Sequence, residues 1–336
     1  MKVLQIEGAF GLENLKLAAR SQPQPGPGEV LLRMRAASLN YRDLLMVQGA
    51  YNPRQPLPLI PCSDGVGEVV AVGEGVSRVA VGDRVVTLFC QGWISGEPIR
   101  SFMGSTLGGP LDGTLAEFMV LSEEGVSAAP EHLSDQEAAT LTCAGLTAWS
   151  ALVTQGGIGE GDTVLVLGTG GVAVFALQFA QLLGAQAIIT SSSDEKLERA
   201  RTLGAGAGIN YRETPEWARE VKELTDGGGV DLVVEVGGAE TLPQSVRAVR
   251  PGGQISLIGN LSGAVLDFNI VPVFMRSVRI QGIAVGHREG FEAMSRAVSE
   301  HRMRPVVDHV LPWGEARQAL GELAAGRHFG KICLRF

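Results

Sequence analysis

The chain has 336 residues, of which 45% are hydrophobic and 19% are charged, so it is long enough for about two globular domains. Its formal net charge of -8, without a Lys/Arg run, argues against a nucleic-acid partner, because phosphate binding requires clustered basic side chains. The longest apolar stretches are shorter than the roughly 18 residues of a membrane span, so we expect no membrane partner. The four cysteines form no CxxC pair, which favours reduced thiols and a cytoplasmic protein.

The first 125 residues predict a β-rich domain. A Pro-Gly-Pro-Gly run at 25–28 predicts a turn before the first long strand. Stretches rich in β-branched residues and bounded by Gly and Pro predict strands over Glu29–Ala36, Gly65–Val72 and Asp83–Leu88.

From Leu133 onward, helices and strands alternate, which predicts a parallel sheet with right-handed crossovers. The strands are continuous apolar runs, as expected when helices cover both faces of a sheet. The expected strands are Thr163–Leu167, Ala187–Thr190, Ile209–Asn210, Asp231–Val236, Gln254–Ile258 and Val278–Val285. The helices between them are Val172–Leu183, Asp194–Leu203, Trp217–Thr225 and Leu242–Val249. Two more helices, Phe291–Glu300 and Glu315–Ala325, precede a last strand, Lys331–Arg335.

The strongest motif is the glycine-rich turn Gly168-Thr169-Gly170-Gly171-Val172, which links a predicted strand to a predicted helix. Gly168 permits a tight turn, and Gly170 lets the backbone approach a pyrophosphate at the helix N-terminus. Ala173 replaces the third glycine of the GxGxxG pattern, which is a tolerated variant. The strand–turn–helix context predicts a bound dinucleotide, and the alternative is a purely structural turn.

The strand after this turn lacks the terminal Asp or Glu that usually holds the ribose 2′-hydroxyl of NAD. Hydroxyl donors and one cation suit a 2′-phosphate instead, so we expect NADP as the cofactor. The alternative is NAD, with Asp194 reaching the ribose and Ser193 acting only as a helix N-cap. The residues expected around the 2′-phosphate are Ser191, Ser192, Lys196 and Tyr211.

Segments along nearly the whole chain resemble the medium-chain dehydrogenase/reductase superfamily. They are Ala37–Asp43, Pro58–Gly67, Val81–Val85, the glycine-rich turn and Gly330–Ile332, in this order. The resemblance implies an α/β fold in which a Rossmann doubly wound parallel sheet is inserted in a GroES-like β-rich catalytic domain. We therefore expect residues 1–125 and 281–336 to form the catalytic domain and residues 126–280 to form the cofactor-binding domain.

Zinc-dependent members of this superfamily bind a catalytic zinc through Cys, His and Cys, with a Glu after the His. The matching positions here hold Asn40, Ser63 and Cys143, and Asp64 stands in the place of the Glu. Because Asn and Ser are poor zinc ligands, the resemblance implies that no zinc is bound. The alternative is a metal site assembled from Cys62, Asp64 and Cys143.

Asn40 and Tyr51 resemble the zinc-independent quinone oxidoreductase branch, although Leu45 stands where that branch often has a second tyrosine. Without a Lewis acid, hydride transfer favours an activated small-molecule carbonyl substrate, namely a quinone or an α,β-unsaturated ketone or aldehyde. The resemblance implies that Asn40 and Tyr51 would hydrogen-bond the developing oxyanion. We take Asn40, Tyr51 and Asp64 as the catalytic residues, while their structural alternatives are a turn residue, a rim aromatic and a loop brace.

Four further residues are expected near the cofactor, and two of them, Thr147 and Lys331, match superfamily positions and have a structural alternative. Thr147 is expected at the nicotinamide, unless it only bonds its own helix backbone. Asn260 and Val285 follow strands at the carboxyl edge of the sheet, where ligands bind. Lys331 matches a tail that often touches the cofactor, and the alternative is entry into a core strand.

Two other functions remain open, and the partner is expected to be a second copy. One alternative is an alcohol dehydrogenase or aldehyde reductase on the same scaffold, and another is a non-catalytic NADPH-binding sensor or structural protein. The apolar run Val278–Val285 could be a sheet edge, and such edges are usually covered. We therefore expect a homodimer.

Overall fold

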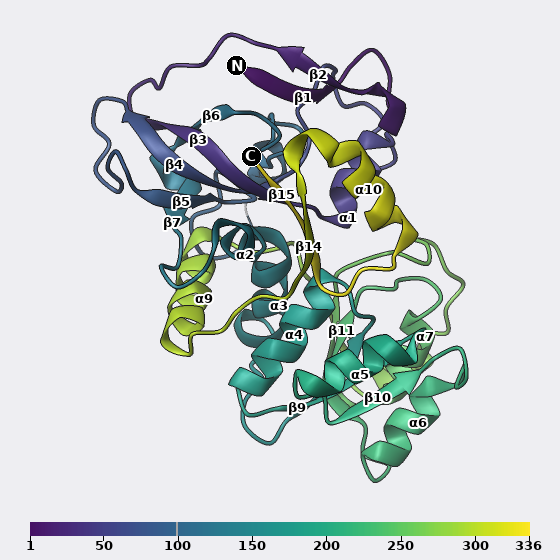
Figure 1. Ribbon diagram of the computed structural model, residues 1–336. Helices are drawn as coiled ribbons and strands as arrows, with labels where there is room; N and C mark the ends of the chain where they lie inside the picture. Colours follow the sequence, from purple (N-terminus) through teal and green to yellow (C-terminus); the bar gives the residue numbers. More distant parts are fainter. Residues whose placement is uncertain (99) are drawn as a thin grey trace. The chain divides into compact units, whose positions relative to one another are not determined.

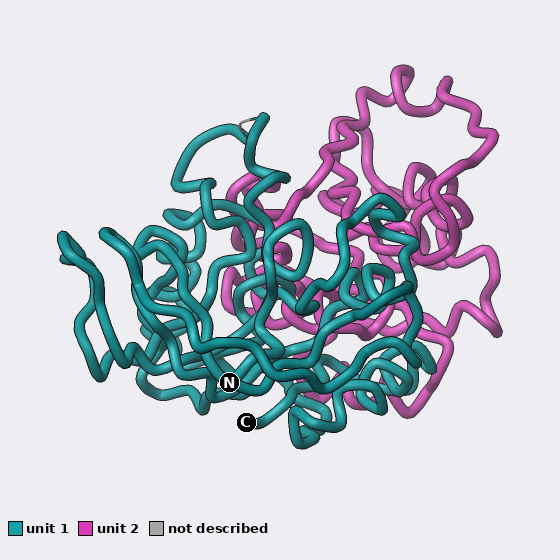
Figure 2. Tube along the Cα trace, turned by 90° about the horizontal axis from the view of Figure 1, so that it is seen from above, with its two compact units in different colours: residues 1–146, 286–336 teal, residues 147–285 magenta. Residues whose placement is uncertain are grey.

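The computed structural model describes residues 1–98 and 100–336, which form two compact units (Figure 2). Unit 1 comprises Met1–Leu146 and Gly286–Phe336, and unit 2 comprises Thr147–Val285. Unit 2 is therefore inserted into unit 1, as the sequence predicts.

The first boundary falls at residue 146 instead of 125, because the intervening residues pack within unit 1. There β7 (Val126–Ala128) pairs with β5 (Arg84–Thr87), and α2 (Asp135–Ala139) packs against β3 (Glu29–Ser38). The second boundary falls at residue 286 instead of 281.

Unit 1 is built on a seven-stranded sheet with the order β14-β15-β3-β4-β5-β7, in which β6 also pairs with β3 (Figure 1). Its other strands are β4 (Asp64–Val72), β6 (Phe118–Ser122), β14 (Val307–Pro312) and β15 (Lys331–Arg335). A separate antiparallel pair consists of β1 (Lys2–Ile6) and β2 (Leu15–Ala19). The helices are α1 (Tyr41–Val47), α2, α9 (Arg288–Glu300) and α10 (Ala316–Ala325), with a π-helical turn at Leu141–Gly145 and 3-10 turns at Leu12–Asn14, Phe102–Ser105, Glu123–Gly125 and Trp313–Glu315.

The end of the chain lies in the middle of this sheet. Strand β15 pairs antiparallel with β3 through Cys333 and Ser38, and Leu39 N donates to Ile332 O at 3.0 Å. Ile332, Cys333 and Leu334 are fully buried, because the strand is covered on both faces. This pairing places Lys331, the first residue of β15, next to the start of α1.

Unit 2 is a six-stranded parallel sheet with the order β10-β9-β8-β11-β12-β13. Its strands are β8 (Thr163–Leu167), β9 (Gln186–Ser191), β10 (Ala207–Asn210), β11 (Val230–Glu235), β12 (Val249–Leu257) and β13 (Arg279–Gly282). Helices α4 (Gly171–Leu182) and α5 (Asp194–Thr202) pack on β8, β9 and β10 (Figure 1). Helix α7 (Leu242–Ala248) packs on β11 and β12 and against α6 (Trp217–Leu224). The remaining helical segments are α3 (Leu146–Trp149), a π-helical stretch Ser150–Thr154 and α8 (Val271–Met275).

This arrangement confirms the expected doubly wound parallel sheet inserted in a β-rich domain. The expected strand Val278–Val285 is wrong in its extent, because β13 covers only Arg279–Gly282 and Val285 adopts φ 57°, outside the strand region. The sequence does not predict α1, β2, β6 or β14, which are short elements with weak periodicity. Across residues 1–98 and 100–336, no helix is long and apolar enough to cross a membrane.

A close backbone approach holds the segment that leads into β4. Gly113 N donates to Ile60 O at 2.7 Å, and a Cβ at Gly113 would lie 1.9 Å from Cys62 O. We therefore expect Gly113→Ala to cost about 1–3 kcal/mol and to lower the midpoint of thermal unfolding, because the backbone must shift. The control is Gly321→Ala, inside α10, where an added Cβ meets no atom within 4 Å. Because alanine has the higher helix propensity, we expect this variant to raise the free energy of unfolding by about 0.5–1 kcal/mol. Equal midpoints for both variants would contradict this packing, as measured by circular dichroism.

Candidate functional site

The glycine-rich turn leaves an open space in front of the N-terminus of α4. Gly168 has φ 78°, a left-handed conformation that glycine adopts without strain, and its N–H donates to Thr190 Oγ1 at 3.2 Å. A Cβ added at Gly170 would meet no atom within 4 Å. Gly170 is the N-cap of α4 and has no side chain to occupy the first N–H groups of the helix. This geometry fits a pyrophosphate, which would accept hydrogen bonds from Gly171 and Val172.

Two neighbouring strands bring the expected 2′-phosphate residues together. Ser191 ends β9 and is buried, and Tyr211 follows β10 and donates its backbone N–H to Ser191 O at 3.0 Å. Ser192 is half-buried beside them. Ser193 Oγ accepts from Lys196 N at 3.4 Å, so this serine also caps α5. The lysine therefore begins its side chain one turn into the helix, at the same edge of the sheet.

The first acidic side chain after β9 is already engaged. Asp194 Oδ1 accepts a hydrogen bond from Asn210 Nδ2 at 2.8 Å, which ties the start of α5 to the end of β10. This contact gives the carboxylate a structural role and draws it toward β10. It therefore weakens the alternative in which Asp194 holds a ribose hydroxyl.

A buried carboxylate that the sequence analysis does not identify organises the next loop of this edge. Glu235 ends β11 and is fully buried. Its Oε1 accepts from Gly237 N at 2.8 Å, Gly238 N at 3.1 Å and Thr241 Oγ1 at 2.6 Å, and its Oε2 accepts from Ser245 Oγ. The loop after β11 is thus fixed from within, and the signal was an acidic residue ending an otherwise apolar strand.

Backbone hydrogen bonds join the loop that carries Asn260 to the loop after β11. Ser262 N donates to Gly237 O at 2.7 Å, and Ala239 N donates to Gly263 O at 3.0 Å. Asn260 itself is exposed beyond the carboxyl end of β12. Of the other two expected residues in unit 2, Thr147 is buried in α3 and Val285 is half-buried at the end of the unit.

In unit 1, four side chains form a ring of polar contacts at the start of α1 and β4. Lys331 Nζ donates to Asn40 Oδ1 at 2.6 Å, and Asn40 Nδ2 lies 3.5 Å from Ser63 Oγ. Ser63 Oγ donates to Asp64 Oδ1 at 3.0 Å, and Asp64 Oδ2 lies 3.8 Å from Lys331 Nζ. Lys331 also donates to Leu39 O at 2.5 Å. The structure therefore brings Asn40, Asp64 and Lys331 together within unit 1.

Lys331 is buried within unit 1, and its expected contact with the cofactor stays a prediction. Its side chain is 3% exposed, and its ammonium group is directed into unit 1 toward Leu39, Asn40 and Asp64. The reason is the β15–β3 pairing, which turns the first side chain of β15 toward the start of α1. Its entry into a core strand was the structural alternative.

Burial and opposite charges set the electrostatics of this ring. Burial raises the pKa of the Asp64 carboxyl above its ordinary value, and the nearby Lys331 ammonium opposes the shift. Burial raises the pKa of Asp43 to about 6, and the adjacent Arg42 lowers it. Asp43 Oδ2 accepts from Asn40 N at 2.8 Å and so helps to cap α1. Two cations therefore face two carboxyl groups inside unit 1.

Tyr51 stacks on Arg42 and keeps an exposed edge. The Arg42 guanidinium lies 4.8 Å from the centroids of both the Tyr51 and Phe89 rings. It also donates to Leu107 O at 2.8 Å and Gly109 O at 3.1 Å, so its position is fixed. The Tyr51 side chain is nevertheless 40% exposed, which leaves its hydroxyl accessible to a ligand.

Two of the three positions that align with zinc ligands hold poor zinc ligands, Asn40 and Ser63. Asn40 and Ser63 contact each other, and the Asn40 oxygen accepts from the Lys331 ammonium. Burial raises the pKa of the Cys143 thiol far above its ordinary value. In the described part of the chain, no group of at least three His, Cys, Asp or Glu side chains could hold a metal ion. The donor set therefore fits an ammonium ion better than Zn²⁺.

Models of two known domain families match most of the chain. The alcohol dehydrogenase GroES-like domain matches residues 26–131, and the zinc-binding dehydrogenase domain matches residues 171–300. A zinc-type alcohol dehydrogenase-like protein of Schizosaccharomyces pombe is 41% identical over 332 residues, which is 97% of this chain and 96% of the relative. A quinone oxidoreductase of Pseudomonas aeruginosa is 36% identical over 270 residues, which is 80% of this chain and 76% of the relative. An acryloyl-coenzyme A reductase of Metallosphaera sedula is 30% identical over 344 residues and covers 99% of both chains.

Solved structures agree with this assignment over the whole chain. An NAD-dependent alcohol dehydrogenase matches with a TM-score of 0.90 and 35% identity, covering 100% of both chains. A mycobacterial protein solved in complex with NADPH matches with a TM-score of 0.84 and 28% identity, also covering 100% of both chains. The chain therefore belongs to the medium-chain dehydrogenase/reductase superfamily of NAD(P)H-dependent oxidoreductases.

Proposed function

We propose that this oxidoreductase uses NADPH to reduce an activated carbonyl acceptor, a quinone or an α,β-unsaturated ketone or aldehyde, without zinc. The observation that carries the proposal is the ring at Asn40, where an amide and a serine hydroxyl stand at two positions that align with zinc ligands and a lysine ammonium contacts the amide. A Lewis acid assists the reaction of a plain alcohol or ketone by polarising its oxygen, whereas a conjugated acceptor spreads the developing charge and depends less on that help. Relatives named quinone oxidoreductase and acryloyl-coenzyme A reductase also support an activated acceptor.

The roles of the unit 1 side chains follow from their contacts. NADPH, when bound, supplies the hydride from C4 of its nicotinamide. The Asn40 amide N–H and the Tyr51 hydroxyl would donate hydrogen bonds to the oxygen on which negative charge develops. The last proton would come from Tyr51 or from water. Asp64 would act indirectly, by positioning other side chains of the ring, because its Oδ1 accepts from Ser63 and its Oδ2 faces Lys331.

The proposed cofactor is NADP, bound at the carboxyl edge of the unit 2 sheet. Ser191, Ser192, Lys196 and Tyr211 would surround the 2′-phosphate. The contact between Asp194 and Asn210 supports this choice, since it engages the nearest carboxylate. The NADPH complex of one related structure is consistent with NADP, while another relative is named NAD-dependent.

Two alternatives remain, and each has a specific discriminator. The name of the Schizosaccharomyces pombe relative favours an alcohol dehydrogenase or aldehyde reductase, which would prefer simple alcohols or aldehydes over quinones and enones. A non-catalytic NADPH-binding sensor or structural protein would bind NADPH without turnover of any substrate. The cytoplasmic location remains a prediction, which the four free cysteines support.

The zinc-free reduction can be tested on exhaustively chelated protein. We expect NADPH-dependent reduction of quinones or enones at an unchanged rate after chelation, and little activity with simple alcohols. Asn40→Ala should lower kcat by about 10²-fold, because it removes a donor to the oxyanion. Activity that is lost on chelation and restored only by zinc would contradict the proposal.

The choice of cofactor can be tested at the end of β9. Ser191→Asp places a carboxylate at the proposed 2′-phosphate site. The carboxylate would repel the 2′-phosphate of NADPH and could accept a hydrogen bond from the 2′-hydroxyl of NADH. We expect the ratio of kcat/KM for NADPH over NADH to fall by about 10²-fold, mostly through KM for NADPH. The control Ser295→Asp, on α9 of unit 1, should leave this ratio unchanged. A wild-type enzyme that prefers NADH would contradict the assignment.

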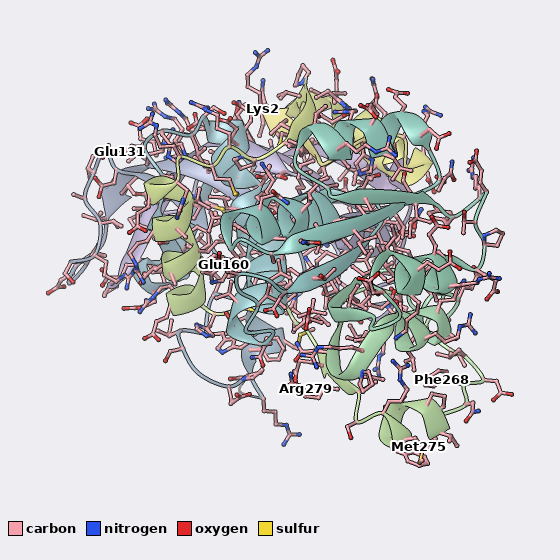
Figure 3. The ribbon with its side chains drawn as sticks, turned by 90° about the horizontal axis from the view of Figure 1, so that it is seen from below. Lys2, Glu131, Glu160, Phe268, Met275 and Arg279 are labelled. Carbon is pink, nitrogen blue, oxygen red and sulfur yellow. The ribbon has the colours of Figure 1, made fainter. Side chains whose placement is uncertain are left out.

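We also propose a homodimer formed through β13 and α8, and light scattering tests it. All four residues of β13, at the edge of the sheet, are exposed, as are Val271, Phe274 and Met275 of the neighbouring α8 (Figure 3, where Met275 and Arg279 are labelled). An exposed sheet edge of this kind is usually covered, and a second copy can pair with it across a two-fold axis. Phe274→Asp should give monomers, whereas Leu17→Asp, at an exposed leucine of β2, should keep the dimer mass. A monomeric wild type at micromolar concentration would refute the dimer.

A further inference from the structure

We propose that Lys331 is a positioning residue, whose ammonium group fixes the Asn40 amide so that its NH₂ group is presented to the substrate oxygen. This inference rests on the proposed function and goes beyond it. It explains how an amide side chain, whose oxygen and NH₂ group can exchange places by a 180° rotation, is held so that it acts only as a hydrogen-bond donor to the substrate. It also assigns a task to the end of the chain, since Lys331 lies 291 residues beyond Asn40.

The cation determines which amide atom faces it. Lys331 Nζ lies 2.6 Å from Asn40 Oδ1 and 2.5 Å from Leu39 O, and Asp64 Oδ2 is 3.8 Å away. An ammonium group has three N–H donors and no acceptor, so it is stable only beside atoms that accept a hydrogen bond or carry negative charge. The atom of Asn40 that faces Lys331 must therefore be the amide oxygen. The side chain is 3% exposed, so water has little access to replace the amide oxygen.

The other side of the amide reinforces the same orientation. Ser63 Oγ donates its proton to Asp64 Oδ1 at 3.0 Å and therefore turns a lone pair toward Asn40 Nδ2, 3.5 Å away. Turning the amide over would place NH₂ against an ammonium group and C=O against that lone pair. The first contact would be repulsive, and the second could be relieved only if Ser63 gave up its hydrogen bond to Asp64, so the ring favours one orientation of Asn40. The long contact with Ser63 and the side-chain hydrogen bond to Asp64 both lie on the NH₂ side of the amide, away from Lys331.

The consequence for catalysis concerns kcat more than binding. Without the cation, only the contacts with Ser63 and Asp64 distinguish the two amide orientations, so the flipped amide becomes more populated and the substrate oxygen more often meets a carbonyl. The hydrogen bond to the developing charge is then weakened, while the cofactor site in unit 2 is untouched. If Lys331 had only a structural role, its substitution would lower stability, and its effect on kcat would be the same whether or not the Asn40 amide is present.

A double-mutant cycle tests this dependence. We expect Lys331→Met to lower kcat by about 10-fold or more in the wild-type background, with KM for NADPH changed by less than about 2-fold. In the Asn40→Ala background, the same substitution should change kcat by less than about 2-fold, because there is no amide left to orient. An equal loss of kcat in both backgrounds would overturn the proposal. Lys16→Met, which removes an exposed lysine of β2, is the matched control and should behave as wild type.

A second variant covers a failure to fold. Lys331→Met leaves Asp64 as an unpaired buried carboxylate, which is strongly destabilising. Lys331→Met/Asp64→Asn removes both charges with little change of volume, and it should fold and bind NADPH like Asp64→Asn alone. We expect its kcat to lie about 10-fold or more below that of Asp64→Asn, and equal values would contradict a role of Lys331 in orienting Asn40.

The amide orientation can also be observed without an assay. In a neutron structure of the deuterium-exchanged protein, we expect two deuterons on the Asn40 atom that faces Ser63 and none on the atom that faces Lys331. The reverse orientation in an active enzyme would overturn the inference alone. The expected orientation in a protein that turns over no quinone or enone would sink the proposed function instead.

Discussion

The ammonium group of Lys331 is enclosed by Leu39 O, Asn40 Oδ1 and the Asp64 carboxylate, and much of unit 1 depends on this arrangement. Removing water from a cation and a carboxylate is costly, and the loss of one partner of such a buried pair typically costs about 3–5 kcal/mol. The last strand of the chain therefore cannot leave β3 without exposing Asp64 as an uncompensated charge. The same contact fixes the side chain that we take as the oxyanion donor. Stability and proposed chemistry are thus linked through one nitrogen atom.

The candidate residues of unit 2 and those of unit 1 are held in place in two different ways. In unit 2, the ligand-facing groups are backbone groups at the carboxyl ends of parallel strands, as at Gly168, and they need small residues and fixed loops. Glu235 supplies such fixation by accepting hydrogen bonds from Gly237, Gly238 and Thr241. In unit 1, the corresponding groups are side chains held by other side chains. Substrate preference can therefore change in unit 1 while the nucleotide site stays the same.

The sequence predicts the architecture well because the architecture depends on local patterns. The apolar runs β8 and β11 and the turn at Gly168 each appear within a few adjacent residues. The short elements α1 and β14 escape this reasoning, since seven and six residues carry too little periodicity. The extent of the edge strand β13 also escapes it, because the positive φ of Val285 depends on its surroundings.

The sequence by itself determined the superfamily resemblance, the dinucleotide turn and the replacement of zinc ligands at Asn40 and Ser63. These features lie within single segments, where residue type and spacing are sufficient. Only the tertiary structure decided which side chains contact Asn40, because Lys331 reaches it from 291 residues away through the pairing of β15 with β3. Strand pairing between distant segments leaves no mark in local spacing, so the sequence did not predict this lysine beside the amide.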